Sequence, residues 1–294
     1  MQNFTEDQVL KLLPMSACVD RMRFAFEELR AGRPVNQPRR RLILKTGSVL
    51  HQMAGSCGNY FATKIYSSNL KHGGLHQMFV ILYDAETGKP LAFMEANNLS
   101  LIRTGAATGY AADLLADPQA SMMTVIGSGY QARTQVEAVR SVRPIKEVRV
   151  WSRTPENARR FAEQIGGRAM ESAEAAVRDS PIVVTITTSK DPVLEASWVA
   201  PGAFVAGAGS NAATRRELPA DLLTRAGLVV VDNLEQAKIE AGDLLIPNHW
   251  EGVVELKDVT PGYVPGRITV FKSIGIAVED AAAAAYVFEQ SQKK

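Results

Sequence analysis

A glycine-rich turn near the middle of the chain has the residue types and spacing that bind a phosphate group. An apolar run from Met122 to Ile126 leads into Gly127-x-Gly129-x-x-Ala132, and a helical pattern follows at once. Gly127 permits a tight turn, Gly129 leaves room for a pyrophosphate beside the backbone, and Ala132 lets the helix lie close to the strand. The N–H groups at the helix start would face the anion. The motif predicts a dinucleotide-binding site, with a ligand-free glycine turn as the alternative.

The residues after the second expected strand of this region indicate which dinucleotide is bound. Strand 147–151 is followed by Ser152, Arg153 and Thr154, without a carboxylate. In a dinucleotide fold, Asp or Glu at this point binds the ribose 2′-hydroxyl of NAD, whereas a cation accommodates the 2′-phosphate of NADP. A guanidinium and two hydroxyls suit a phosphate. The sequence therefore favours NADP(H), with NAD(H) possible; a solvated surface position for Arg153 is the alternative.

Composition and charge exclude several classes of protein. The chain has 294 residues, enough for one large or two ordinary domains, and its apolar content of 46% supports a sizeable core. A net charge of +2 with mixed signs gives no nucleic-acid-binding surface. Cys18 and Cys57 lack the spacing of metal or redox motifs, and neither a secretory signal nor a membrane-length apolar run is recognisable. We expect a cytoplasmic protein without a metal, membrane or nucleic-acid partner.

Periodicity divides the chain at Asp117-Pro118. Before this point we expect antiparallel strands at 41–44, 59–67, 78–83 and 91–94 and a helix rich in small residues at 101–115. After it, short apolar runs alternate with helical patterns, which is typical of a parallel sheet with helical crossovers. The expected strands are 122–126, 147–151, 182–187, 203–208, 228–231 and 269–271; a helix is expected at the start of 251–267, and a last helix at 278–290. The sequence predicts an α/β fold.

Separated stretches along nearly the whole chain share the motifs of one family. In chain order they are Gln37-Pro38-x-Arg40, Ala62-Thr63-Lys64, Leu101-Ile-Arg103-Thr104-Gly-Ala-Ala, Gly127-Ser-Gly129-Tyr-Gln131-Ala132, Val150-Trp151-Ser-Arg153-Thr154, Gly207-Ala-Gly209-Ser210, Arg216-Glu217-Leu218, Glu240-Ala-Gly242-Asp243 and Phe271-Lys-Ser273-Ile-Gly275-Ile-Ala-Val-Glu279-Asp280. The chain thus resembles the ornithine cyclodeaminase/μ-crystallin family. The resemblance implies a homodimer with a Rossmann NAD(P)-binding domain (118–267) and an α+β substrate-binding and dimerisation domain (1–117 with 268–294).

The resemblance also implies the residues of the site. The family's carboxylate-binding cations correspond to Arg40, Lys64 and Arg103, which we expect to converge on one substrate carboxylate. Lys64 and Arg103 are the predicted catalytic residues; Lys64 would donate a proton, with a bound water as the alternative donor. The predicted cofactor-binding residues are Thr104, Gly127, Ser128, Gly129, Tyr130, Gln131, Ala132, Ser152, Arg153, Thr154, Thr187, Gly207 and Ser273. We interpret the family positions Glu240, Asp243 and Asp280 as structural.

One position distinguishes among the activities of the family. Cyclodeaminases carry an aspartate where this chain has Asn211, a predicted substrate-binding residue, and an amide cannot take up a proton as that carboxylate does. We expect an NAD(P)H-dependent oxidoreductase that reduces the C=N bond of a cyclic ketimine carboxylate or 2-imino acid, such as Δ1-pyrroline-2-carboxylate, Δ1-piperideine-2-carboxylate or the imine of pyruvate. The alternatives are an ornithine or lysine cyclodeaminase that retains NAD, and a non-enzymatic NADPH-binding protein of the crystallin type.

Overall fold

The computed structural model describes residues 1–69 and 71–293; Leu70 and Lys294, both in the predicted substrate-binding domain, lie outside the described residues. The chain divides into a first unit, Met1–Arg103 with Ile276–Lys294, and a second unit, Thr104–Gly275. These bounds differ from the predicted domain limits at residues 117 and 268. Helix α3 (Asn97–Leu115) contains the first bound, and strand β14 (Thr269–Lys272) belongs to the sheet of the second unit.

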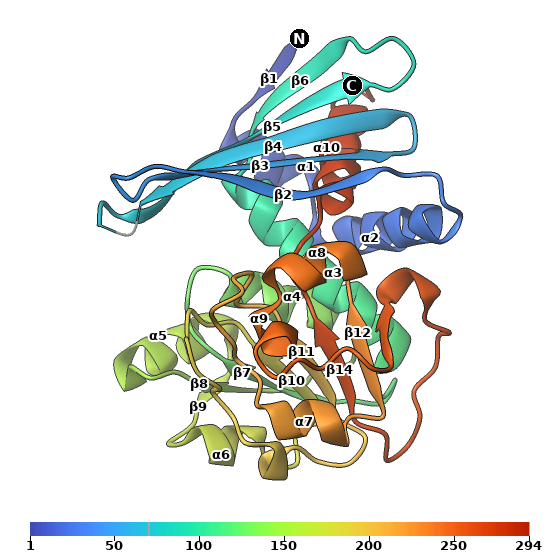
Figure 1. Cartoon of the computed structure of the whole chain (residues 1–294). Helices are drawn as coiled ribbons and strands as arrows, with labels where there is room; N and C mark the ends of the chain where they lie inside the picture. The colour runs from blue at the N-terminus through green and yellow to red at the C-terminus, as the bar shows by residue number, and fades with distance from the viewer. Residues whose placement is uncertain (70, 294) are drawn as a thin grey trace. The chain divides into compact units, whose positions relative to one another are not determined.

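The first unit is built on a six-stranded sheet in the order β1-β6-β5-β4-β3-β2. Strand β1 pairs parallel with β6, and the other neighbours are antiparallel. The strands are β1 (Gln2–Phe4), β2 (Asn36–Ile43), β3 (Val49–Cys57), β4 (Tyr60–Asn69), β5 (Gly74–Asp84) and β6 (Pro90–Glu95). The helices are α1 (Glu6–Leu12), α2 (Met15–Arg30), the start of α3, and α10 (Ala277–Ser291), which packs on β3, β4 and α2 (Figure 1).

Close packing of α10 on the sheet depends on small residues. The helix presents a run of alanines from Ala281 to Ala285, all nearly or fully buried. On β3, Gly55 lies under the helix start, where an added Cβ would be only 2.8 Å from the backbone carbon of Ala277. The Ala277 N–H donates to the Asn36 side chain at 3.0 Å, which anchors the same end of the helix to β2. The first turn of α10 is therefore held directly against the sheet.

The second unit contains an eight-stranded, wholly parallel sheet in the order β13-β12-β14-β11-β10-β7-β8-β9. The strands are β7 (Met122–Ile126), β8 (Glu147–Trp151), β9 (Arg168–Ala169), β10 (Ile182–Thr185), β11 (Phe204–Gly207), β12 (Leu228–Val231), β13 (Val253–Glu255) and β14. The helices are α4 (Ala132–Val142), α5 (Pro155–Ile165), α6 (Ala173–Val177), α7 (Ala220–Arg225), α8 (Leu234–Glu240) and α9 (Gly242–Leu245). This parallel sheet is the Rossmann-type arrangement that the sequence predicts. The segment 251–267 was predicted to begin with a helix; it contains β13 and a 3-10 turn at Leu256–Asp258 instead.

The second half of α3 belongs to the second unit because its small residues pack against α4. An added Cβ on Gly105 would lie 2.4 Å from the Thr134 carbonyl oxygen, and one on Gly109 would lie 3.0 Å from Ala138. The Arg143 guanidinium, next to the end of α4, donates to carbonyl oxygens at the end of α3, including that of Ala112 at 2.8 Å. This close contact explains why the unit bound lies within the helix and not in the turn after it.

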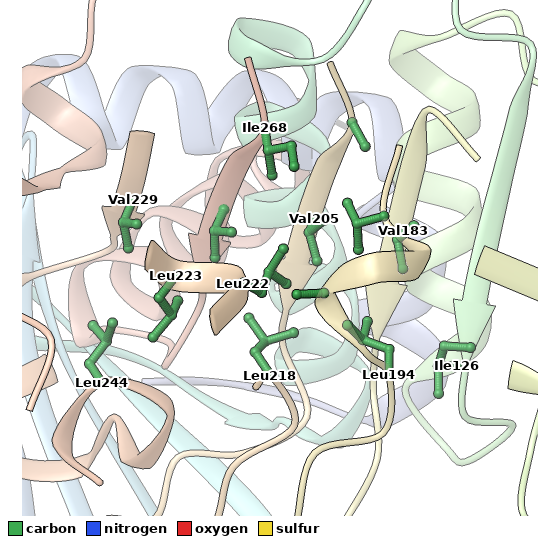
Figure 2. Close-up of a cluster of buried hydrophobic side chains, with 14 of the residues drawn as sticks. Ile126, Val183, Leu194, Val205, Leu218, Leu222, Leu223, Val229, Leu244 and Ile268 are labelled. Atoms are coloured by element: carbon green, nitrogen blue, oxygen red, sulfur yellow. The ribbon is translucent and has the colours of Figure 1, made fainter. Parts of the chain in front are cut away.

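Branched aliphatic residues from strands and short helices form the core on one face of the parallel sheet. Figure 2 shows Leu218, Leu222 and Leu223 directed at the sheet residues Val205 and Val229, and all five are buried. A parallel sheet needs apolar side chains packed on both of its faces, because its strands are buried on both sides. Across the described residues, no helix has the length and apolarity to cross a bilayer.

Candidate functional site

The glycine turn after β7 has the local geometry that the motif predicts. Gly127 has a φ of +116°, and an added Cβ would lie 2.4 Å from the Ile186 carbonyl oxygen, so a side chain is excluded there. At Gly129, in contrast, an added Cβ would meet no described atom within 4 Å. Space beside the backbone at Gly129 is what a pyrophosphate requires. Ala132, fully buried, starts α4 behind the turn.

This turn lies at the point where the strand order of the parallel sheet reverses. From β7 the chain continues outward to β8 on one side, and it returns to β10 on the other. Ligands of open parallel sheets bind at such a switch point, beyond the carboxyl ends of the strands. A cavity of about 690 Å³ opens there. It is lined by residues that follow β7, β8 and β10, among them Gly127, Ser128, Gly129, Ser152, Arg153, Thr154 and Thr187.

The lining fits a dinucleotide. Seven of the predicted cofactor-binding residues, those just named, lie in it together. Trp151, Asn157 and Trp198 also line the cavity and were not predicted. Trp151 precedes the Ser-Arg-Thr segment directly, so its position was available from the sequence. Trp198 ends a 3-10 turn (Ala196–Trp198) between β10 and β11, and only the fold reveals that it lies here.

Six predicted cofactor-binding residues lie outside this lining in the described part of the chain: Thr104, Tyr130, Gln131, Ala132, Gly207 and Ser273. Their surroundings differ. Tyr130 is 70% exposed, whereas Ala132 is packed beneath the turn. Gly207 is buried at the end of β11, against Leu218. Ser273 donates to the Asp232 carboxylate at 3.4 Å. Their contact with a cofactor stays a prediction.

A buried carboxylate to which the sequence analysis gave no role joins two loops at the carboxyl edge of the sheet. Glu217 accepts hydrogen bonds from the Thr187 N–H at 2.6 Å, the Thr187 hydroxyl at 2.7 Å and the Gly209 N–H at 2.6 Å. Burial raises the pKa of Glu217, although the positive charge of Lys272 and the hydrogen bonds from Thr187 oppose the shift. Glu217 thus fixes Thr187, which lines the cavity, to the loop after β11.

A buried lysine holds the same loop from beneath. Lys272, with no exposed surface, donates to the carbonyl oxygens of Gly207 at 3.1 Å and Ser210 at 2.6 Å. Its ammonium lies 3.0 Å from the Asp243 carboxylate, which itself accepts from the Glu217 and Leu218 N–H groups. The sequence signal was a single charge directly after the predicted strand 269–271; in the structure Lys272 is the last residue of β14. The interpretation of Asp243 as structural agrees with these contacts.

In the first unit, two of the predicted cations meet on one carboxylate. Lys64, on β4, donates to Asp280 Oδ1 at 2.9 Å, and its ammonium is equally close to Oδ2. Arg103, on α3, donates through Nε to the same Oδ1 at 2.9 Å and through Nη1 to Glu279 at 2.7 Å. All four side chains are at most 5% exposed. Ser100 accepts a further hydrogen bond from Lys64 at 3.3 Å.

The charges of this cluster shift the protonation of its members. Burial, and then the positive charges of Arg103 and Arg39, lower the pKa of Lys64 to about 7, although Asp280 opposes the shift. Burial alone would raise the pKa of Asp280, but the charges of Arg103, Lys64 and Arg39 and the hydrogen bond from Lys64 outweigh it and lower the pKa. An amine with a pKa near 7 is suited to proton transfer at neutral pH.

The third predicted cation, Arg40, does not join the cluster. Arg40 is exposed, whereas Arg39 is 5% exposed and acts electrostatically on Lys64 and Asp280. The cause is a bulge: Gln37 pairs with Ala54, but Arg40 pairs with Gln52, so β2 contains one extra residue. A bulge reverses which side chains face the covered side of a sheet. Arg39 then lies across from Met53, in the row that continues to Lys64.

Two further predictions have different outcomes. Asp280 was interpreted as a structural residue, but it contacts both predicted catalytic residues, Lys64 and Arg103. Asn211 lies in the second unit, exposed on the loop after β11. Its role in substrate binding stays a prediction.

Among the described residues, no group of three or more His, Cys, Asp or Glu side chains is arranged to hold a metal ion.

Comparison with known proteins identifies the family. The profile of the ornithine cyclodeaminase/mu-crystallin family matches residues 3–294. The chain belongs to this family. It is 37% identical over 219 residues to the ketimine reductase mu-crystallin of Mus musculus, which covers 73% of this chain and 69% of the mouse protein.

Two solved structures share the whole fold. The Δ1-pyrroline-2-carboxylate reductase of Thermococcus litoralis, in complex with NADH and L-proline, superposes with a TM-score of 0.92 at 29% identity, covering 100% of this chain and 98% of that one. An archaeal alanine dehydrogenase dimer with bound NAD gives a TM-score of 0.92 at 31% identity, covering 100% and 96%. These likenesses confirm the predicted family, the α/β fold with a Rossmann-type unit, and the enzyme class, an NAD(P)-dependent oxidoreductase acting on C=N bonds.

Proposed function

We propose that this protein reduces the C=N bond of a cyclic ketimine carboxylate or a 2-imino acid with NAD(P)H. The observation that carries the proposal is the buried cluster in the first unit, where Lys64 and Arg103 share Asp280 and the pKa of Lys64 is lowered to about 7. Such a cluster supplies the two things that the reaction needs from the protein. These are positive charge for a substrate carboxylate and a proton for the imine nitrogen.

The cations of the cluster suit an anionic substrate. Lys64, Arg103 and Arg39 are all buried in the same part of the first unit. Cations that lie close together attract an anion more strongly where water is excluded. The carboxylate of a 2-imino acid is such an anion, and guanidinium groups fix its orientation. In this proposal Arg39 takes the place in the carboxylate clamp that the sequence assigned to Arg40.

Proton transfer is assigned to Lys64. Reduction of an imine is faster when its nitrogen is protonated, because the iminium carbon is the better hydride acceptor. A lysine with a pKa near 7 carries a proton at neutral pH and releases it readily. When bound, the cofactor supplies the hydride; Lys64 supplies the proton that makes the product a secondary or primary amine.

The cofactor would be held by the cavity of the second unit. Gly127 and Gly129 provide the turn and the space for the pyrophosphate, and Ser152, Arg153 and Thr154 line the part that follows β8. NADH and NAD are the nucleotides in the two solved relatives. We propose a preference for NADP(H) here, because the segment after β8 offers a guanidinium and two hydroxyls without a carboxylate.

The amide at Asn211 supports reduction over cyclodeamination. A lyase of this kind must move protons on the substrate amine during ring closure and ammonia loss. An amide side chain donates and accepts hydrogen bonds but takes up no proton at ordinary pH. Imine reduction needs no such carboxylate when Lys64 provides the proton.

We further propose a homodimer of cytoplasmic location. The face of the six-stranded sheet opposite to α10 carries half-buried apolar side chains, including the stacked pairs Phe61–Tyr83 and Phe79–Phe93, whose ring centroids are 4.8 and 5.2 Å apart. Contiguous apolar surface of this kind is typical of an interface. The archaeal relative is a dimer. The proposed cytoplasmic location follows from cysteine usage, because a chain with only two cysteines, Cys18 and Cys57, is typical of a reducing compartment. Sedimentation of the purified protein tests the dimer.

The activity is tested by following NADPH and NADH oxidation with Δ1-pyrroline-2-carboxylate, Δ1-piperideine-2-carboxylate, and pyruvate plus ammonia. We expect turnover with at least one cyclic ketimine, and a higher kcat/KM with NADPH. The Lys64→Met variant is the matched control, because it removes the proton donor and one cation while leaving the cavity of the second unit intact. Ammonia release from ornithine without net cofactor oxidation would replace this proposal with the lyase.

A further inference from the structure

Asp280 lies between the two residues to which the proposed function gives the chemistry. Its Oδ1 atom accepts from Lys64 Nζ and from Arg103 Nε, each at 2.9 Å, although the three residues are far apart in sequence. The carboxylate is 1% exposed. A buried carboxylate that accepts two charged donors holds both in a single geometry, because moving either one would leave an uncompensated charge.

We propose that Asp280 is a positioning residue, which ties the proton donor Lys64 to the carboxylate-binding Arg103 and keeps the donor amine charged. The proposal rests on the function proposed above. It assigns to Asp280 a role that neither its position in the sequence nor the family motif provides, since the motif only places an acidic pair at the start of α10.

The fold delivers this carboxylate to a defined place. Asp280 is in the first turn of α10, which Gly55 allows to approach the sheet and which Asn36 anchors through the Ala277 N–H. The adjacent Glu279 is fully buried and binds Arg103 from the same turn. Glu279 thus accepts a hydrogen bond from Arg103, and Asp280 accepts hydrogen bonds from both Lys64 and Arg103.

The groups around Lys64 define what Asp280 must counteract. Arg103 and Arg39 both disfavour the charged amine, as does burial, and Asp280 is the carboxylate that favours it. The Tyr66 ring lies 5.9 Å from Nζ, and His51, stacked on Tyr66, has a pKa lowered to about 4 by burial and by Arg41, Arg39 and Lys64, so it is neutral near pH 7. The titratable and charged groups that face the cluster are Arg39, Arg41, His51, Tyr66, Arg103, Glu279, Asp280 and Cys18, whose thiol pKa is raised.

These charges give the direction in which the pKa of Lys64 should change when Asp280 is replaced. Since Asp280 favours the ammonium form, Asp280→Asn lowers the pKa of Lys64 from about 7, and the donor loses its proton at a lower pH. Removal of an opposite charge in direct contact is expected to shift it by about 1 to 3 units. At pH 8 the protonated fraction, and with it kcat/KM, then falls at least about tenfold, whereas at pH values below the new midpoint the loss is small.

The decisive measurement does not require turnover. Lysine labelled with 13C at Cε reports each amine by NMR, and the Lys64 resonance is assigned by its absence in Lys64→Met. We expect a Lys64 midpoint near 7 in the wild type, a midpoint at least one unit lower in Asp280→Asn, and a midpoint within half a unit of the wild type in Glu279→Gln, the matched control. An unchanged midpoint in Asp280→Asn, or an equal shift in Glu279→Gln, overturns the proposal.

Kinetics separate this inference from the proposed function. If no imine is reduced but the Lys64 midpoint moves as expected, the inference about Asp280 holds and the reaction must be reassigned. A loss of activity that is uniform across pH, with an unchanged Lys64 midpoint, would make Asp280 a structural residue only.

Should Asp280→Asn fail to fold, Asp280→Glu keeps the charge but displaces it by one methylene. That variant should keep the Lys64 midpoint and weaken binding of pyrrole-2-carboxylate at least tenfold; unchanged binding counts against the proposal.

Discussion

The bulge in β2 makes a prediction that separates two adjacent arginines. The family motif assigns carboxylate binding to Arg40, but the extra residue between Gln37 and Arg40 turns Arg40 outward and Arg39 inward. We expect Arg39→Met to impair the proposed reaction and Arg40→Met to leave it nearly unchanged. The two variants remove the same charge from neighbouring positions, so each is the control of the other.

The size of the effect follows from burial. Arg39 is 5% exposed and lies two strands from Lys64 in one row of the sheet, so its guanidinium would meet a bound carboxylate away from bulk water. A hydrogen bond to a charged group is worth about 1.5–3 kcal/mol, which corresponds to a roughly 10- to 150-fold loss of kcat/KM. An exposed cation such as Arg40 contributes at most about 1 kcal/mol, or roughly fivefold.

The assay is the initial rate of NAD(P)H oxidation with the preferred imine across the neutral pH range. Arg39 lowers the pKa of Lys64, so removal of Arg39 should raise that pKa. The alkaline limb of the kcat/KM profile should then move to higher pH. The clamp and the proton donor are thereby distinguished, because Arg39→Met raises KM while it extends the active pH range. A loss in Arg40→Met that equals or exceeds the loss in Arg39→Met would refute the assignment.

Three further predictions concern the second unit. Gly129→Ala should fold normally, because open space surrounds that position, yet bind NADPH at least tenfold more weakly, because its methyl group would occupy the space needed by the pyrophosphate. Gly127→Ala should instead lower the Tm, since its Cβ would lie 2.4 Å from a carbonyl oxygen. Melting curves and NADPH fluorescence titrations compare the two variants. Arg153→Ala should raise the KM for NADPH about tenfold and leave that for NADH unchanged; equal effects on both would remove the 2′-phosphate assignment. Lys272→Met should cost about 3–5 kcal/mol in urea unfolding by leaving Asp243 buried without its cation, and Lys272→Met with Asp243→Asn should recover part of that loss.

The dinucleotide site was predictable because its chemistry is local. A strand, a glycine turn and a helix start lie within residues 122–132, and the Ser-Arg-Thr segment follows the next strand directly. Each of these features depends on backbone conformation over a few residues, which residue type controls. The longer strands of both units were largely expected for the same reason. Strands β1, β3 and β9 were missed, and the segment after residue 251, which contains β13, was assigned a helix.

The contacts of the buried carboxylates were not predictable in this way. Glu217, Asp243 and Asp280 stood in recognisable motifs, but a sequence does not show which donors lie beside a carboxylate from another element. The unit bound within α3 was missed for a related reason. A turn at Asp117-Pro118 is visible in the sequence, whereas the packing of Gly105 on α4 depends on a contact between two helices.

The arginine pair shows most directly where motif-based prediction ends. A motif fixes a residue's place in the chain, and alternation along a strand then predicts the side of the sheet that it faces. One inserted residue reverses that prediction for every position until the register is restored. In β2 the chain places arginine at residues 39, 40 and 41, so a cation faces the covered side of the sheet whichever register holds. Substitution of Arg39 alone therefore tests whether this basic run contains one functional residue or several.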